Sequence, residues 1–271
     1  TLLDVIAGRK NTGIITGEIK LNGHVVKQET FARLTAYCEQ MDMHNEFTTV
    51  REALEFSAKL RLDPSISDET RHAFVDEALE ILELDSIAGR MIGTAGSETG
   101  LAPGQRKVLT VAVELVSNAP VFFLDEPTSG LDARSALIVM KEVKKVAQLG
   151  RTVISTIHQP SMEIFVMFDD MLLLQRGGYQ VFFGELGPGG ATMVNYLQSL
   201  NMSFPLPAGM NPASWMLDVL GGNDSSGGVS MKEGAPRHNN SVKRNSSMRR
   251  SGSGITLDGL VLDQKFAASA Q

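Results

Sequence analysis

Two adjacent carboxylates, Asp125 and Glu126, directly follow a run of four apolar residues at positions 121–124. A short, bounded apolar run is typical of a fully buried strand in a parallel sheet. Open α/β folds bind ligands at the carboxyl edge of such a sheet, so this strand would deliver both acids to a binding site. There Asp125 can hold Mg²⁺ through a water, and Glu126 can polarise a water for attack on a γ-phosphate. The alternative is that the pair only ends a strand and caps the next helix.

A histidine, His158, closes a second strand-like run at residues 152–157. A predicted helix at 133–149 joins the two runs, and a right-handed βαβ connection places both strand ends on one edge of the sheet. His158 can then reach the same phosphate as the two acids. A single histidine beside a strand is more often a hydrogen-bonded core residue, and it is the acidic pair that favours a catalytic role here.

The remaining pattern predicts an α/β domain with a helical insert. Residues 17–22 alternate in polarity and favour a small antiparallel sheet. Thr49 and Glu52 form a capping-box pattern ahead of a helix, and Ser67 is a candidate N-cap for a second helix that carries apolar positions to Leu84. Further predicted elements are helices at 1–7, 103–117 and 212–220 and a hairpin of strands at 171–174 and 180–183.

The C-terminal part differs in composition from the rest of the chain. Residues 221–256 are rich in Gly, Ser, Asn and basic residues and nearly free of apolar ones, so we predict a disordered linker. Residues 257–271 regain apolar character and are predicted to begin a helical connector. Basic residues precede serines at 243–246 and 250–253, which suits basophilic kinases or contact with anionic lipid heads. Short runs of this kind also arise by chance in disordered tails.

Composition argues against several classes of protein. The net charge of −6 and the pI near 5.4 disfavour a nucleic-acid footprint, which needs clustered Lys and Arg. The most apolar stretch, at 164–174, is broken by Asp169 and Asp170, so no run reaches the ~18 apolar residues of a membrane span. The single cysteine, Cys38, is compatible with a reducing cytosol.

Four segments together resemble the motifs of ABC ATPases. Residues 37–40 (YCEQ) resemble the Q-loop, 121–126 Walker B, 129–132 the D-loop, and His158 the switch histidine. The resemblance covers roughly residues 1–220. The longer stretches YCEQMDMH, QRKVLTVAVEL, FLDEPTSGLDARSA, TIHQPS and NPASWMLDV are similar to the ATPase domains of subfamily G transporters of the pleiotropic-drug-resistance type.

This resemblance implies a P-loop NTPase fold of the ABC-ATPase type. Such a fold is α/β, with a parallel core sheet flanked by helices, a small antiparallel β subdomain and a helical signature subdomain. It implies that residues 1–220 bind ATP and Mg²⁺ at the cytoplasmic face of a membrane and hydrolyse ATP to power export of hydrophobic compounds, drugs or lipids. The partners would be a second nucleotide-binding domain and a transmembrane domain outside this sequence, with no nucleic acid.

The same resemblance assigns roles to individual residues. Glu126 and His158 would be catalytic, with His158 holding the γ-phosphate. Thr1, Gln40 and Asp125 would contact the nucleotide, and Gln40 and Asp125 would hold Mg²⁺ directly or through water. Gln40 would also sense the transmembrane domain. The D-loop would communicate across a dimer, and it comprises Ser129, Gly130, Leu131 and Asp132.

The sequence departs from the family pattern at its start. The family's Gly-rich phosphate loop would lie immediately before Thr1, so these 271 residues lack the lysine and the glycines that cradle the β- and γ-phosphates. We therefore expect an N-terminally truncated domain, which on its own binds ATP poorly or not at all.

A second departure lies in the signature motif, where LAPGQ replaces the usual LSGGQ. The motif comprises Leu101, Ala102, Pro103, Gly104 and Gln105. Ala102 has no hydroxyl and Pro103 has no N–H, so two donors to a γ-phosphate are lost, each contributing roughly 1.5–3 kcal/mol. A second interpretation, compatible with the first, is that Pro103 simply begins a helix. Because ABC signatures complete the partner's ATP site, this combination resembles the C-terminal nucleotide-binding domain of a full-size asymmetric transporter.

Other functions remain open at the level of sequence. A soluble ABC ATPase of repair or translation would lack the NPASWMLDV segment. A non-catalytic regulatory half is favoured by LAPGQ and disfavoured by the presence of Glu126 and His158. An inactive, truncated gene product is the third alternative.

Overall fold

The computed structural model describes residues 2–10, 12–175, 177–200, 205–221, 248–251 and 254–262. The chain divides into two compact units, the first built mainly from Leu21–His158 and the second mainly from Gln159–Val261. The predicted site residue Thr1 and most of the predicted linker at 221–256 lie outside the described residues, and so do Ser246 and Ser253, which end its two candidate phosphorylation sites. The domain limits proposed from sequence stay predictions.

A three-stranded parallel sheet forms the centre of the first unit. Its strand order is β3-β4-β5, with bounds Thr35–Cys38, Val121–Leu124 and Thr152–Ser155. Cys38 pairs with Leu124, and Leu124 pairs with Ser155, so the three carboxyl ends lie level on one edge. All four residues of β4 are buried, as its apolar run predicted. The predicted parallel α/β architecture is confirmed.

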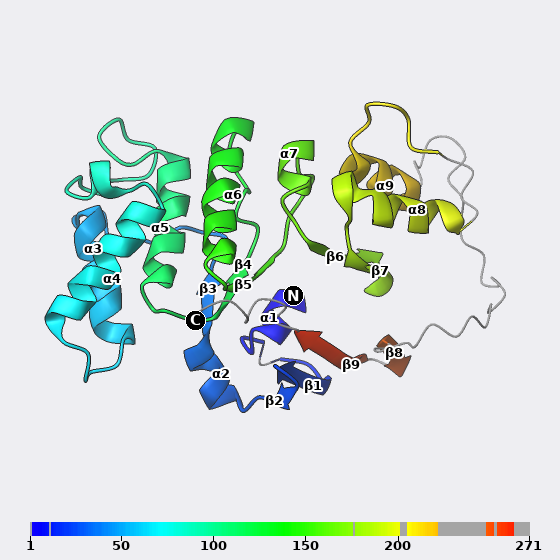
Figure 1. Cartoon of the computed structure of the whole chain (residues 1–271), viewed down its shortest axis with the longest axis horizontal. Coiled ribbons are helices and arrows are strands. Elements are labelled where there is room, and N and C mark those ends of the chain that lie inside the picture. The colour runs from blue at the N-terminus through cyan, green and yellow to red at the C-terminus, as the bar shows by residue number, and fades with distance from the viewer. Residues whose placement is uncertain are drawn as a thin grey trace, which may run out of the picture. The chain divides into compact units, whose positions relative to one another are not determined.

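Helices pack around this sheet and extend the first unit. Helix α5 (Pro103–Leu115) packs against β3, α6 (Ala133–Gln148) packs against β5, and the two helices pack on each other (Figure 1). Helices α3 (Val50–Arg61) and α4 (Asp68–Ile81) pack together, and α3 also contacts α5. This pair corresponds to the helical insert that the sequence predicted.

Side-chain caps set the starts of α3 and α4. The Glu52 N–H donates to Thr49 Oγ1 at 3.2 Å, and the Thr49 N–H donates to Glu52 Oε2 at 2.7 Å, so the predicted capping box is confirmed. Ser67 Oγ accepts from the Thr70 N–H at 3.3 Å. Helix α4 ends at Ile81 because Glu83 adopts a positive φ of 54° and the following N–H returns to the carbonyl of Leu79.

Shorter elements lie before α3 and after α4. They are α1 (Leu2–Ile6), β1 (Ile15–Leu21), β2 (His24–Val25), α2 (Gln28–Leu34) and the 3₁₀ turn η1 (Asp85–Ile87). Most of β1 belongs to the second unit and the others to the first. Asn22 and Gly23, both at positive φ, make the tight turn between β1 and β2. The sequence did not predict α2, because this helix buries only Phe31 and carries no apolar stripe.

The second unit is organised around a hairpin and helices. The predicted hairpin is confirmed as β6 (Asp170–Gln175) and β7 (Tyr179–Glu185), which pair antiparallel. Its helices are α7 (Met162–Phe165), η2 (Pro188–Gly190), α8 (Ala191–Ser199) and α9 (Pro212–Gly221). Their apolar side chains form one core that includes Phe165, Phe182, Met193, Leu197 and Trp215. Asn211 caps α9, accepting at Oδ1 from the Ala213 N–H at 3.0 Å.

Two strands lie near the C-terminus. Strand β8 (Met248–Ser251) pairs antiparallel with β9 (Gly254–Leu262). Residues 257–262 therefore belong to a strand where the sequence analysis expected the start of a helix. The segment GITLDGLVL contains three β-branched residues, which favour a strand, and two glycines, which disfavour a helix.

Phe123 offers a test of the core of the first unit. Its ring is fully buried in β4 and lies 6.3 Å, between centroids, from the rings of both Phe31 and Tyr37. We expect Phe123→Ala to lower the free energy of unfolding by about 3–5 kcal/mol in urea denaturation, because it leaves a cavity at the centre of the sheet. Phe56→Ala is the matched control, since Phe56 on α3 is 67% exposed and its loss should cost less than about 0.5 kcal/mol. Equal losses would show that β4 is not at the centre of a packed core.

Candidate active site

The carboxyl ends of β3, β4 and β5 bring together the polar residues that follow each strand. Gln40 comes two residues after β3, Asp125 and Glu126 come directly after β4, and Thr156 comes directly after β5. The Asp125 N–H donates to the Cys38 carbonyl at 3.0 Å and extends the β3–β4 pairing by one step. Three strands distant in sequence thus supply one cluster of acids, an amide and a hydroxyl.

The Thr156 hydroxyl joins the two acids to β5. Thr156 Oγ1 accepts from the Glu126 N–H at 2.8 Å and donates to Asp125 Oδ1 at 2.8 Å. Glu126 has a φ of 45°, in the left-handed region that residues other than glycine seldom adopt. The threonine therefore holds a strained turn that sets the direction of both carboxylates. Sequence reasoning missed Thr156, which is one of three hydroxyl residues in the run at 152–157 and carries no signal that separates it from the other two.

Gln40 completes the cluster from the side of β3. Its Nε2 donates to Glu126 Oε2 at 2.8 Å and lies 3.5 Å from Ser129 Oγ. The amide carries both a donor and an acceptor, so its N–H can remain on Glu126 while its oxygen faces an ion. The structure therefore brings together four of the predicted site residues: Gln40, Asp125, Glu126 and Ser129.

The oxygens in this cluster suit Mg²⁺, which needs few protein ligands, better than a metal ion whose ligands all come from the protein. In the described part of the chain no group of three or more His, Cys, Asp and Glu side chains is placed to hold a metal ion. Mg²⁺ is commonly held by one or two protein oxygens and completes its shell with water and substrate phosphates. The oxygens of Asp125 and Gln40 fit that requirement.

His158 stands apart from the hydrogen-bonded cluster. It lies three residues beyond the end of β5, and its side chain is exposed. The Asp125 carboxylate is hydrogen-bonded to Thr156, and the Glu126 carboxylate to Gln40. A catalytic role for His158 stays a prediction.

The D-loop segment forms a turn that leads from the acids into α6. The Ser129 N–H donates to the Glu126 carbonyl at 3.0 Å, and Gly130 supplies the positive φ of 74° that the turn requires. Asp132 then caps α6, accepting from the backbone N–H groups of Arg134 and Ser135 at 3.0 Å each. The Ser135 hydroxyl, at 2.6 Å, is the main cause that lowers the pKa of the Asp132 carboxyl, followed by the Ser135 N–H.

The signature segment forms the start of α5. Pro103 is the first helical residue, as the alternative interpretation predicted, and Ala102 is the N-cap. Alanine has no oxygen to cap the helix, and only the reverse bond forms, from the Ala102 N–H to Gln105 Oε1 at 3.1 Å. A Cβ on Gly104 would lie 3.2 Å from Ser135 Cβ, so this glycine allows α5 and α6 to start close together. Leu101, which precedes the N-cap, is buried.

The segment after Gln40 is anchored to α5 through His44. His44 Nε2 lies 2.9 Å from Thr110 Oγ1 and 3.4 Å from the Arg106 carbonyl. Since a carbonyl only accepts and the threonine hydroxyl itself donates to Asp42 Oδ1 at 2.7 Å, Nε2 carries the proton. Burial is the largest influence on His44 and lowers its pKa. The Arg106 carbonyl and the Asp42 charge oppose that shift, while the Arg106 and Lys107 charges add to it.

Comparison with protein families fits this geometry. Residues 1–129 match a family model described as ABC transporter. Over 219 residues, 81% of this chain, the sequence is 52% identical to ABC transporter G family member 51 of Oryza sativa subsp. japonica. The chain carries an ABC transporter domain. Pleiotropic drug resistance protein 1 of Nicotiana tabacum is 49% identical to this chain, again over 219 residues, or 81% of the chain. The chain spans about 15% of the length of each of these relatives.

Other comparisons bear on the fold and on the second unit. The ABC domain superposes with a TM-score of 0.53 on an ATP-binding cassette solved as a dimer in a post-hydrolysis state with ADP and Pi, at 19% identity. The match covers 69% of this chain and 80% of that one, and it confirms the predicted ABC-ATPase fold. Residues 158–236 match a family model described as ABC-2 type transporter. None of the described helices has the length and apolar character needed to cross a bilayer.

Thr156→Val tests the bridge between the two acids. The change keeps the shape of the side chain but leaves the Glu126 N–H and Asp125 Oδ1 without this partner, so we expect the free energy of unfolding to fall by about 1–3 kcal/mol. Urea denaturation measures the loss. Thr156→Ser keeps the hydroxyl and should stay close to the unchanged protein. A valine variant as stable as the serine variant would contradict the bridge.

His44 predicts a dependence of stability on pH. Because its pKa is lowered in the folded state, the unfolded chain takes up a proton below about pH 6.5 that folded His44 resists. Its contribution to the free energy of unfolding is therefore complete above that pH and falls as the pH is lowered. The urea midpoint should therefore fall between about pH 7.5 and about pH 5.5, and the fall should be smaller in His44→Gln than in the unchanged protein. An equal fall in both would show that His44 titrates normally.

Proposed function

We propose that this ABC domain binds ATP with Mg²⁺ and hydrolyses ATP to drive an exporter of hydrophobic compounds, drugs or lipids. The observation that carries the proposal is the cluster at the sheet edge, where the Gln40 amide contacts Glu126 and Thr156 fixes Glu126 and Asp125. Membership of an ABC family and similarity to G family transporters support the same function. The match of residues 158–236 to an ABC-2 type transporter model favours a transporter over a soluble ABC ATPase.

Each member of the cluster has a distinct role in this proposal. Asp125 and the Gln40 oxygen would hold Mg²⁺, which would offset the negative charge of the phosphates. Glu126 orients the attacking water, and the Gln40 N–H sets the direction of its carboxylate. The exposed His158 side chain holds the γ-phosphate from the end of β5. Residues 1–271 contain no Gly-rich phosphate loop, so we expect the isolated chain to bind ATP weakly and to turn over none.

The partner of the domain is a second nucleotide-binding domain. The signature segment Leu101–Gln105 then serves the partner's ATP site, while Glu126 serves this domain's own site. Ala102 offers no hydroxyl and Pro103 no N–H at the start of α5, so the partner site loses two donors. One composite site hydrolyses ATP and the other mainly holds it. In this arrangement Asp132, at the start of α6, reaches the dimer interface.

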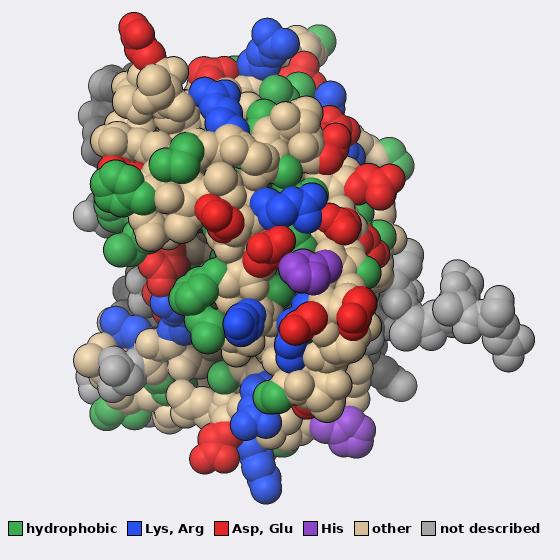
Figure 2. Space-filling model, turned by 90° about the vertical axis from the view of Figure 1, so that its left-hand side faces the viewer, with side chains coloured by type: hydrophobic (Ala, Val, Ile, Leu, Met, Phe, Trp, Pro, Cys, Tyr) green, Lys and Arg blue, Asp and Glu red, His purple; other side chains and the backbone are tan. Residues whose placement is uncertain are grey.

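A transmembrane domain is the second proposed partner, which places the ABC domain at the cytoplasmic face of a membrane. The loop that follows Gln40 exposes three large apolar side chains: Met41 is 75%, Met43 82% and Phe47 83% exposed. Grouped apolar side chains on a surface mark interaction sites. Figure 2 faces the side of α3 and α4 and shows apolar groups among interspersed acidic and basic ones, without a field of one sign.

Glu126→Gln in the complete transporter tests the function. The amide cannot act as the carboxylate does, so ATP turnover should fall at least about 100-fold while ATP still binds. Ala102→Ser is the comparison, since restoring one hydroxyl to the partner site should change turnover less than about twofold. Steady-state phosphate release and nucleotide binding measure both. Unchanged turnover in Glu126→Gln would refute the assignment and favour a regulatory or inactive domain.

A further inference from the structure

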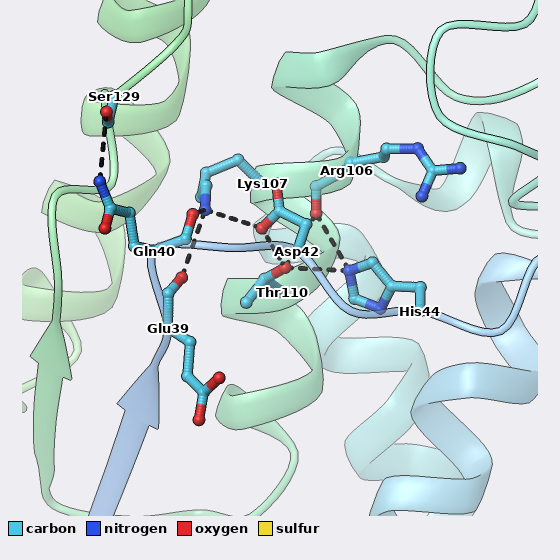
Figure 3. Close-up of polar contacts among 8 residues, drawn as sticks. All are labelled: Glu39, Gln40, Asp42, His44, Arg106, Lys107, Thr110 and Ser129. Atoms are coloured by element: carbon cyan, nitrogen blue, oxygen red, sulfur yellow. Dashed lines mark hydrogen bonds and ion pairs between the residues drawn. The ribbon is translucent and has the colours of Figure 1, made fainter.

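A buried lysine on α5 lies outside the set of proposed catalytic residues. Lys107 is 2% exposed and lies one helical turn after Pro103. Its Nζ donates to the Gln40 carbonyl at 2.8 Å and to the Glu39 carbonyl at 3.3 Å, and it forms an ion pair with Asp42 Oδ1 at 2.8 Å (Figure 3). An ammonium group has three N–H bonds, and three oxygens receive them.

Lys107 holds the backbone of the two residues that follow β3, where hydrogen bonding within the sheet ends. The Cys38 carbonyl, the last in β3, accepts from the N–H of Asp125, the residue that follows β4. The carbonyls of the next two residues, Glu39 and Gln40, accept from Lys107 instead. Figure 3 shows the Lys107 side chain reaching from α5 to this segment. The backbone at Gln40 is therefore attached to α5 and no longer to the neighbouring strand.

Asp42 makes the burial of this charge tolerable and is itself held. A buried ammonium is costly unless it is paired and fully hydrogen-bonded. Asp42 supplies the opposite charge, and its Oδ1 also accepts from Thr110 Oγ1 at 2.7 Å. His44 donates in turn to Thr110, so the chain of contacts returns to α5 one turn after Lys107. Four side chains thus fix the segment 39–44 against one helix.

We propose that Lys107 is a positioning residue for the Gln40 amide. Gln40 is held through its carbonyl by Lys107 and presents its Nε2 to Glu126 Oε2. Fixing the carbonyl restricts the backbone from which the side chain extends, and so fixes the direction of the Glu126 carboxylate. In this role Lys107 acts through Gln40 and not by direct contact with the nucleotide. The inference rests on the proposed function, because it assigns a part of the ATPase cluster.

The test uses Lys107→Met in the complete transporter, which keeps the length of the side chain and removes its donors. We expect kcat for ATP to fall roughly 10- to 100-fold with a smaller change in KM, because misplacement by about 1 Å affects the reacting geometry most. Lys141→Met is the matched control, since Lys141 is an exposed lysine on α6 and its loss should leave kcat unchanged.

A double-mutant cycle with Gln40→Ala separates positioning from general stability. If Lys107 acts through Gln40, the double variant should have nearly the kcat of Gln40→Ala alone. If the two losses multiply, the positioning role is overturned. Should Lys107→Met fail to fold, Thr110→Val replaces it, because it removes the hydroxyl that donates to Asp42 and should give a smaller, equally non-additive loss.

Hydrogen exchange gives a readout that does not depend on ATP turnover. In Lys107→Met or Thr110→Val, the amides of residues 39–43 should exchange faster, while those of β4 and α6 should not change. Uniform acceleration, or none, would overturn the inference. A transporter that hydrolyses no ATP but shows this local exchange would contradict the proposed function and leave the attachment by Lys107 standing.

Discussion

The parallel register of β3, β4 and β5 is the constraint on which the candidate site depends. Because Cys38, Leu124 and Ser155 lie level, the residues after each strand emerge at one edge. Backbone hydrogen bonds between the strands stop there, and side chains bond the backbone of the next one or two residues. Thr156 secures the turn after β4 from the next strand, at a cost in backbone strain that falls on Glu126.

Local sequence signals predicted the elements, and long-range contacts decided what the site contains. The buried strand β4, the capping box at Thr49 and the hairpin of β6 and β7 each follow from neighbouring residues. The bridging role of Thr156 could not be predicted, because its partners lie 30 and 31 residues away. Lys107 gave a faint signal as a charge on the apolar face of α5, but its partners lie 67 and 68 residues away.

The signature segment, residues 101–105, meets one of two requirements: it begins α5 well, but in the proposed function it would offer few donors to a phosphate. Proline is well suited to the first position of α5, where its missing N–H costs no helical hydrogen bond. Gly104 allows the first turn of α5 to approach Ser135, which also contacts Asp132. The segment is thus well built as a helix start, while in the proposed function the same residues would give up donors toward a bound phosphate. How well these five residues start a helix and how well they would donate to a phosphate are therefore separate properties.

Cys38 gives this arrangement a chemical consequence. It is the only cysteine in the sequence, it is 1% exposed, and it ends the strand that leads to Gln40. Burial is the main cause that raises the pKa of its thiol, so the reactive thiolate is scarce while the strand is in place. Alkylating reagents would reach this sulfur chiefly during brief openings of β3. The rate of thiol modification would then report, without any added label, how often this strand detaches from its neighbours.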